Sequence, residues 1–129
     1  MKRHTKLQDL SRDHYAALKL ALHAKRAALS GDRGQIDAAA DACRFAFANE
    51  LEAHFVTEEK DLLPRLLDAG QADLVRRTED EHALLRGLAR ALEDRDAAVL
   101  LSFSAALTDH VRFEERELFE AMERHLAAV

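Results

Sequence analysis

The chain has 129 residues, of which 48% are hydrophobic and 33% are charged, and its formal net charge is −5. This length suits one domain spanning residues 1–129 with its own hydrophobic core. The acidic balance and the lack of a dense basic run argue against nucleic acid or an anionic membrane as a partner. A single cysteine, Cys43, excludes an internal disulfide or a thiolate cluster, so nitrogen and oxygen atoms would have to hold any metal.

Ala and Leu dominate the composition and there is one proline, which favours an all-α fold. Residues 1–10 are too polar for a signal peptide, and no apolar run is long enough to cross a bilayer. We therefore expect a cytoplasmic protein. No feature of the sequence specifies an oligomeric state.

Helical spacing of apolar residues predicts a first helix from Thr5 to a glycine-containing break at residues 30–34. A second helix is predicted to start at Gln35 and to bend or end near Pro64, because proline lacks the backbone N–H that a helix needs. Gly70 is the predicted stop for whatever continues past the proline.

Two further helices are predicted after Gly70, separated by the charged turn at residues 93–96, one aspartate of which is expected to be the N-cap of the last helix. Short connections between long helices place neighbours antiparallel, which predicts an up-down-up-down four-helix bundle. The expected inward face combines apolar and polar residues, among them Leu7, Leu10, His14, Cys43, Phe47, Leu51, His54, Glu58, Leu62, Val75, Thr78, His82, Leu85, Phe103, Leu107, His110, Glu114, Leu118 and Met122.

The second and fourth predicted helices carry the same motif. Residues 51–59 match residues 107–115 at one Leu, one His and two consecutive Glu, and the match extends to Leu62 and Leu118. The first and third helices align more weakly, through a carboxylate followed directly by His14 or His82. The sequence thus contains an internal repeat of one helical hairpin, which predicts a bundle with a pseudo-twofold axis.

A histidine and a glutamate four residues apart lie on one helix face and can reach one point in the bundle interior. His54 with Glu58, and His110 with Glu114, occupy positions that the apolar stripe would otherwise fill with leucine. Burial of a carboxylate without a partner would destabilise the folded protein by several kcal/mol, and a bound cation removes this destabilisation. The predicted metal ligands are His14, His54, Glu58, His82, His110 and Glu114.

Iron suits such a nitrogen and oxygen donor set, manganese and zinc are also compatible with it, and the lack of sulfur argues against a structural zinc site. His4, His23 and His125 are excluded as ligands because they fall off this face or far along the helix. Glu59 and Glu115 are expected to be solvated or ion-paired. Cys43 is expected to be a core residue, and the candidate apolar lining of the site is Phe47, Phe55, Phe103 and Phe113.

Together these motifs resemble the hemerythrin-like, HHE cation-binding family, and the resemblance extends over nearly the whole chain. It implies two non-haem iron ions bridged by carboxylates, with or without an oxo bridge. One iron would be held by His14 and His54 and the other by His82 and His110, with Glu58 and Glu114 bridging. Oxygen carriers of this family have a fifth histidine at the position where this chain has Arg86. Two further residues are candidate ligands: Glu79, three residues before His82, and Glu115, five residues after His110.

The resemblance implies a protein that binds a diatomic ligand, O2 or nitric oxide, for storage, delivery or sensing. The alternative is a di-iron enzyme that reduces peroxide or nitric oxide, because two histidines on each iron leave an exchangeable position on both metals. A third class is an iron-handling or repair module that gives up its metal. Arg86 is expected to steer an anion or to neutralise a carboxylate.

Overall fold

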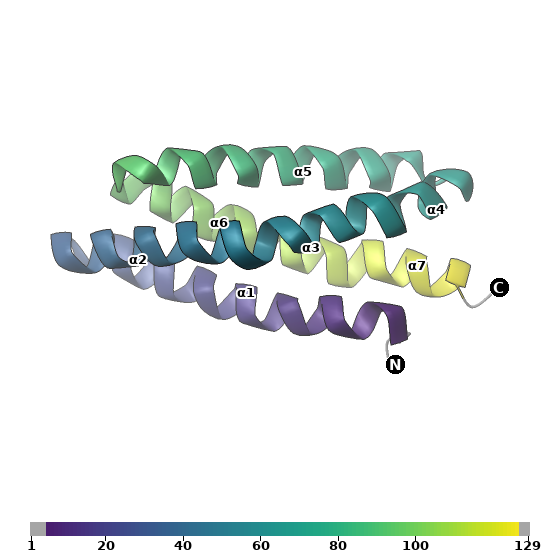
Figure 1. Ribbon diagram of the computed structural model, residues 1–129, viewed down its shortest axis with the longest axis horizontal. Helices are drawn as coiled ribbons and strands as arrows, with labels where there is room; N and C mark the ends of the chain where they lie inside the picture. Colours follow the sequence, from purple (N-terminus) through teal and green to yellow (C-terminus); the bar gives the residue numbers. More distant parts are fainter. Residues whose placement is uncertain (1–4, 127–129) are drawn as a thin grey trace.

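The computed structural model describes the backbone of residues 5–126 and the side chains of residues 7–125, and the described chain forms four antiparallel helical rods (Figure 1). The first rod is α1 (Thr5–Ser30) and the third is α5 (Ala72–Ala91). The second rod runs through α2 (Arg33–Ala46), η1 (Phe47–Leu51), α3 (Glu52–Thr57), η2 (Glu58–Leu62) and α4 (Leu63–Asp68). The fourth runs through α6 (Ala97–Phe113), η4 (Glu114–Leu118) and α7 (Phe119–Leu126).

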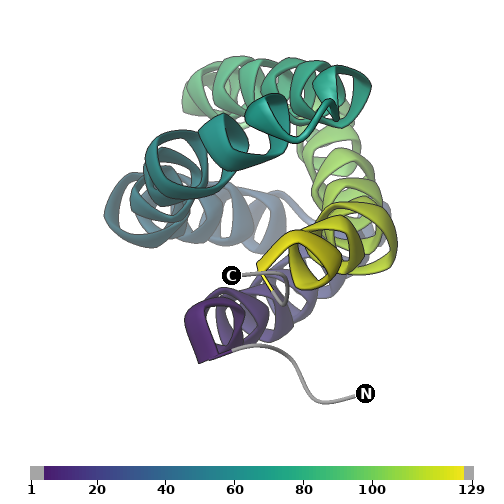
Figure 2. The same ribbon diagram turned by 90° about the vertical axis from the view of Figure 1, so that its right-hand side faces the viewer.

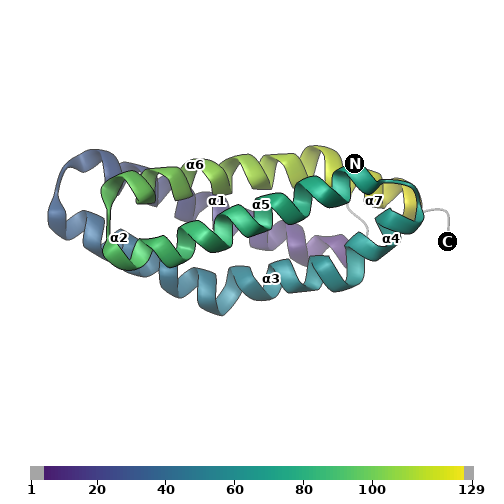
Figure 3. The ribbon, with the colours of Figure 1, turned by 90° about the horizontal axis from the view of Figure 1, so that it is seen from above.

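The rods surround a common axis in the end-on view (Figure 2). Both hairpin turns, α1 to α2 and α5 to α6, lie at one end of the bundle, and the turn from α4 to α5 lies at the other (Figure 3). The prediction of an all-α, up-down-up-down four-helix bundle is therefore confirmed. Among the described helices, none is both long and apolar enough to cross a membrane.

The turns use the residues that their geometry requires. Asp32 caps α2 by accepting a hydrogen bond from the backbone N–H of Gln35, so this helix begins two residues before the predicted start. Gly31 (φ 70°) and Gly70 (φ 81°) adopt left-handed conformations at the turns that follow α1 and α4. The predicted N-cap aspartate of α6 is Asp96, which accepts hydrogen bonds from two backbone N–H groups.

Of the two outcomes predicted at Pro64, a bend or an end, the end is not observed, because the second rod continues past the proline within α4. Pro64 lies in the first turn of α4, directly after the π-helical segment η2, and the rod ends only before Gly70. A proline in a first helical turn removes no hydrogen bond that the new segment needs, because the N–H groups there have no intrahelical partner. The local change of helix type therefore accommodates the proline.

The apolar core is divided into two clusters. One is rich in alanine on α1 and also contains Cys43, Phe55 and Phe103, with Cys43 fully buried as expected. The other gathers Leu7, Leu66 and Phe119 near the opposite end of the bundle. On α1 and α5 the predicted ligand lies between the two clusters, and on the second and fourth rods the ligands lie where one cluster gives way to the other, so most of the apolar core lies toward the two ends of the bundle.

Candidate metal centre

The six predicted ligands meet in the middle of the bundle. His14 comes from α1, His82 from α5 and His110 from α6, and the second rod contributes His54 from α3. Glu58 and Glu114 begin the π-helical segments η2 and η4. All six residues are at most 5% exposed, which is far below what charged side chains normally reach.

The six side chains form two groups that share both glutamates. One group contains His14 and His54, the other contains His82 and His110, and Glu58 and Glu114 belong to each. Within each group, the candidate ligand atoms all lie within 4.8 Å of one another. Two imidazoles and two carboxylates therefore face each of two adjacent points.

The two oxygens of each glutamate face different histidine pairs. Glu58 Oε2 lies 3.1 Å from His54 Nε2, and its Oε1 lies 3.0 Å from His82 Nε2. Glu114 Oε1 lies 2.7 Å from His14 Nε2, and its Oε2 lies 3.0 Å from His110 Nε2. A carboxylate placed in this way can bridge two cations, one at each oxygen.

Several of these inward atoms have no hydrogen-bond partner although they are fully buried. They are both carboxylate oxygens of Glu58, Glu114 Oε2, and the Nε2 atoms of His82 and His110. Neighbouring ligands on a cation with bonds of about 2.1 Å lie roughly 2.9 to 3.4 Å apart, and three of the four separations above, 3.0 to 3.1 Å, fall in this range, while the pair of Glu114 Oε1 and His14 Nε2 is closer at 2.7 Å. Because orphaned buried polar atoms are rare in native proteins, the arrangement fits a pair of bound metal ions.

Each histidine is also held on its outer side by a carboxylate. The ring Nδ1 of every one of the four histidines donates to a carboxylate of a neighbouring rod, which leaves Nε2 free to face the centre. The four pairs are His54 with Asp13 (3.1 Å), His110 with Glu81 (2.7 Å), His82 with Glu59 (2.7 Å) and His14 with Glu115 (2.7 Å).

These outer bonds connect the rods in a closed ring. The second rod is bonded to α1 through Asp13 and to α5 through Glu59, and the fourth rod is bonded to α5 through Glu81 and to α1 through Glu115. Consecutive helical residues point about 100° apart, so the second glutamate of each Glu-Glu pair faces the adjacent rod while the first faces the interior. The pairings repeat in both halves, in agreement with the predicted pseudo-twofold arrangement.

Arginines hold two of the outer carboxylates. Arg86 donates to Glu59 at 2.9 Å and to Glu52 at 2.7 Å, so one guanidinium joins two carboxylates of the second rod. Arg77 donates to Glu81 at 2.9 Å and lies 4.0 Å from the centre of the Phe113 ring. Of the two roles expected for Arg86, the geometry matches neutralisation of a carboxylate.

Without a bound cation, the interior carboxylates would favour charged histidines. Burial lowers the pKa of His54, but the carboxylates of Glu114 and Glu58 outweigh it and raise that pKa to about 11. The same opposition raises the pKa of His82 and of His110 to about 9, and that of His14 above its usual value. A bound cation would take the place of the protons that these pKa values favour on the histidines.

The two interior glutamates respond in opposite directions. Burial raises the pKa of Glu114, but His110, His14 and His54 outweigh it, so the pKa falls well below its usual value. The pKa of Glu58 is raised, because burial and the neighbouring charge of Glu114 oppose its ionisation more strongly than its histidines favour it. The histidines therefore stabilise the ionised form of Glu114, whereas ionisation of Glu58 requires additional positive charge at the centre.

Aromatic rings pack directly on two of the histidines. Phe55 stacks on His82 with ring centres 4.0 Å apart, and Phe119 stacks on His14 at 5.0 Å. Phe47 contacts Phe55 edge-on, and Phe113 lies 6.5 Å from His110. Of the four phenylalanines predicted to line the site, Phe55 lies closest to a ligand histidine. Phe119, which stacks on His14, was not among those predicted.

The remaining candidate residues lie elsewhere. Glu79 is exposed and belongs to neither group, because the buried residue one turn before His82 is Thr78. Glu115 lies on the outer nitrogen of His14 and also belongs to neither group. His23 is exposed and His125 is half-buried outside both groups, and His4 lies outside the described side chains.

Asp13 and Glu81 were not recognised as functional residues from the sequence. Each directly precedes a core-facing histidine, His14 or His82, but each contacts the histidine of the next rod along the chain, not its own neighbour. The repeated pattern of a carboxylate followed by histidine was the available signal. Its meaning depends on how the rods pack, because the two partners are 41 and 29 residues apart in the chain.

Comparison with known proteins agrees with this geometry. The sequence model of the hemerythrin HHE cation-binding domain matches residues 5–125, nearly the whole chain. The chain therefore belongs to the hemerythrin HHE cation-binding domain family. Searches of curated proteins and of solved structures returned no significant match.

Proposed function

We propose that this protein is a non-haem di-iron protein that binds O2 or nitric oxide reversibly, for storage, delivery or sensing. The proposal rests on how the interior carboxylates of Glu58 and Glu114 are oriented. In each of them, one oxygen faces the pair His14 and His54, and the other oxygen faces the pair His82 and His110. In this proposal, Glu58 and Glu114 bridge the two ions and each histidine pair holds one of them.

The donor set supports iron in preference to zinc. Two imidazoles and two carboxylate oxygens supply four protein ligands to each ion, which would complete a tetrahedral zinc site. Iron accepts further ligands and is commonly held by imidazole and carboxylate together, so an exchangeable position remains for a small molecule. When bound, the iron pair would supply the electrons that hold O2 or nitric oxide.

The surroundings favour binding over turnover. Two hydroxyl residues are buried in the described part of the chain: Thr78 donates to the Leu74 carbonyl at 2.8 Å, and Ser104 donates to the Ala21 carbonyl at 2.7 Å. Neither hydroxyl is directed at the centre as a proton donor. Reduction of O2 or peroxide consumes protons, so a centre at which no buried hydroxyl of the described residues is directed is suited to reversible binding.

One observation favours a second candidate, a di-iron enzyme that reduces peroxide or nitric oxide. Among the described residues, no third histidine joins His82 and His110, and the guanidinium of Arg86 is held by Glu52 and Glu59. Both ions would then keep an exchangeable position, so one substrate could contact both. An iron-handling or repair module that releases its metal is the third class.

Elemental analysis and an optical spectrum of protein purified without added metal test the metal site. We expect two irons per chain and a ferric charge-transfer absorption, both retained in His23→Ala and both reduced in His82→Ala. The reduced protein is then mixed with O2 in a stopped-flow instrument. Recovery of the reduced spectrum when O2 is removed supports binding, whereas rapid irreversible oxidation, or peroxide turnover lost in His82→Ala, supports the enzyme.

A further inference from the structure

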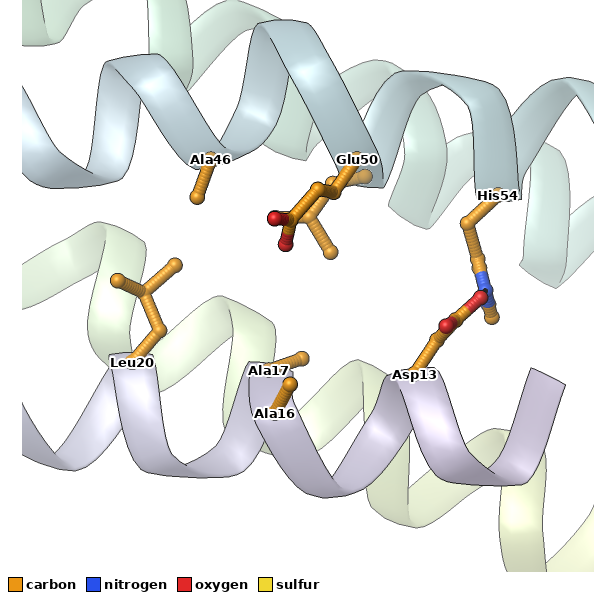
Figure 4. A pocket seen from close by; sticks show the side chains of 8 residues that line it. Asp13, Ala16, Ala17, Leu20, Ala46, Glu50 and His54 are labelled. Carbon is orange, nitrogen blue, oxygen red and sulfur yellow. Dashed lines mark hydrogen bonds and ion pairs between the residues drawn. The ribbon is translucent and has the colours of Figure 1, made fainter. Parts of the chain in front are cut away.

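A pocket of about 330 Å³ opens on the surface between α1 and the second rod and ends at His54 (Figure 4). Its walls include the small side chains of Ala16, Ala17 and Ala46. Figure 4 shows the carboxylate of Glu50 directed into the gap between the helices, and the carboxylate of Asp13 lying against the His54 ring. The pocket therefore leads from solvent to one of the six candidate ligands.

The pocket belongs to one half of the internal repeat. When His14 is aligned with His82, the positions of Ala16 and Ala17 are taken by Leu84 and Leu85. Leu85 is only 1% exposed, so a leucine side chain fills the core where the first half has alanine. Aligning His54 with His110 places Ala106 opposite Glu50, so the carboxylate at the mouth is also absent from the second half.

The charge of this pocket differs from that of two other pockets formed by the described residues. Asp13 and Glu50 line it together with apolar residues and His54, and no Lys or Arg takes part. The second pocket includes Lys60 and Arg65, and the third includes three arginines. None of the six candidate ligands lines either of those two. Of these three pockets, the negative one reaches a candidate ligand, His54.

We infer that this pocket is the entrance through which divalent iron reaches the buried centre, an inference that rests on the proposed function. Two carboxylates line this cleft with apolar walls, Glu50 at its mouth and Asp13 at its inner end, and together they raise the local concentration of cations. Six water molecules occupy roughly 180 Å³, so an iron ion fits in the pocket with its inner hydration shell. The cation loses these waters only as protein ligands replace them.

The contacts at the inner end form a continuous series of ligands. Asp13 Oδ2 lies 3.1 Å from His54 Nδ1, and on the other side of the same ring His54 Nε2 lies 3.1 Å from Glu58 Oε2. That Glu58 oxygen is fully buried and has no hydrogen-bond partner. An ion that leaves Asp13 therefore passes one imidazole ring to reach an orphaned carboxylate of the centre.

Two variants change the entrance without touching the six candidate ligands. Glu50→Gln removes the charge of an exposed side chain at the mouth, and Ala16→Leu introduces the residue found at the equivalent position in the other half. The matched controls are Glu93→Gln and Ala48→Leu, which make the same changes at exposed residues of the third pocket.

The experiment mixes metal-free protein with Fe²⁺ without oxygen and measures the iron that a chelator, added at successive times, can no longer remove. Release is followed separately by dilution of loaded protein into the same chelator. In both entrance variants we expect loading and release to slow by the same factor, at least about threefold, with the final iron content unchanged. In Glu50→Gln the dependence of the loading rate on ionic strength should also weaken.

The outcomes separate this inference from the proposed function. Unchanged rates in Glu50→Gln and Ala16→Leu, or equal slowing in Glu93→Gln and Ala48→Leu, overturn the entrance while leaving the metal site intact. A wild-type protein that takes up no iron at all overturns the proposed function. A change in final iron content with unchanged rates would make Glu50 or Ala16 part of the binding site, which also contradicts a role as entrance.

Discussion

The ring Nδ1 of His82 lies 2.7 Å from the carboxylate of Glu59, a residue on the neighbouring rod that directly follows an interior glutamate. The same relationship joins His14 to Glu115 in the other half. Adjacent glutamates in the repeated motif thus have different roles, one directed to the centre and one to the outside of a histidine. This arrangement makes the rigidity and basicity of the histidines depend on residues that belong to neither ligand group.

Replacing Glu59 by Gln should weaken metal binding without unfolding the protein. The amide cannot accept a charge-assisted hydrogen bond from His82 and no longer pairs with Arg86, so the imidazole becomes a poorer and less ordered ligand. We expect a loss of about 10-fold to 100-fold in iron affinity, measured by competition with a chelator. Glu79→Gln, an exposed change on α5, is the control, and an equal loss in both variants would contradict the prediction.

Neutralising the two interior glutamates should have opposite effects on the metal-free protein. Glu58→Gln removes a carboxylate whose pKa is raised by burial and by Glu114, so the metal-free variant should be at least as stable as the parent. Glu114→Gln removes the partner of three buried histidines and should lower the free energy of unfolding by about 3 kcal/mol. Urea denaturation of the metal-free proteins measures both effects. Equal destabilisation by the two substitutions would contradict the opposite pKa shifts of Glu58 and Glu114.

Metal loading should release protons and should become more favourable as the pH rises. In the metal-free protein the pKa of His54 is about 11 and those of His82 and His110 are about 9, whereas a metal needs neutral imidazoles. Calorimetry of iron binding in buffers with different ionisation enthalpies measures the released protons. A binding enthalpy that does not vary with the buffer would contradict these pKa values.

The same shifts determine how stability depends on pH. Histidines with a raised folded pKa stabilise the metal-free protein fully below about pH 6.5, and the stabilisation is lost as the pH rises through about 9. Glu58 acts in the same sense, because its folded pKa is also raised. We expect the difference in Tm between loaded and metal-free protein to widen from pH 6.5 to pH 9. A constant difference would argue against the prediction.

Arg86 should stabilise the bundle through its planar guanidinium. Arg86→Met removes the bonds to Glu52 and Glu59, and because the group is partly exposed we expect a loss of about 1 kcal/mol in the free energy of unfolding. Arg86→Lys should recover only part of it, because one ammonium cannot bond both carboxylates in the same way. Chemical denaturation measures the change, with Arg90→Met, one turn further along α5, as control. Full recovery by lysine would contradict this explanation.

Local periodicity carried the prediction of the fold and of the ligand face. His54 with Glu58 and His110 with Glu114 follow from four-residue spacing within one helix, and His14 and His82 follow from the apolar stripes around them. The structure brings all six together because each stripe has only one buried direction in an antiparallel bundle. Pro64 was harder to interpret, because the π-helical turn before it is not visible as a periodic pattern.

The sequence by itself therefore determined the bundle, its internal repeat and the six inward side chains, because these depend on spacing within single helices. Only the tertiary structure decided which carboxylate supports which histidine, since Asp13 and Glu81 contact residues of another rod. It also decided that Glu79 faces solvent and that a pocket opens beside His54 and not beside its counterpart. Contacts between rods depend on how helices pack side by side, and no pattern within one helix encodes that.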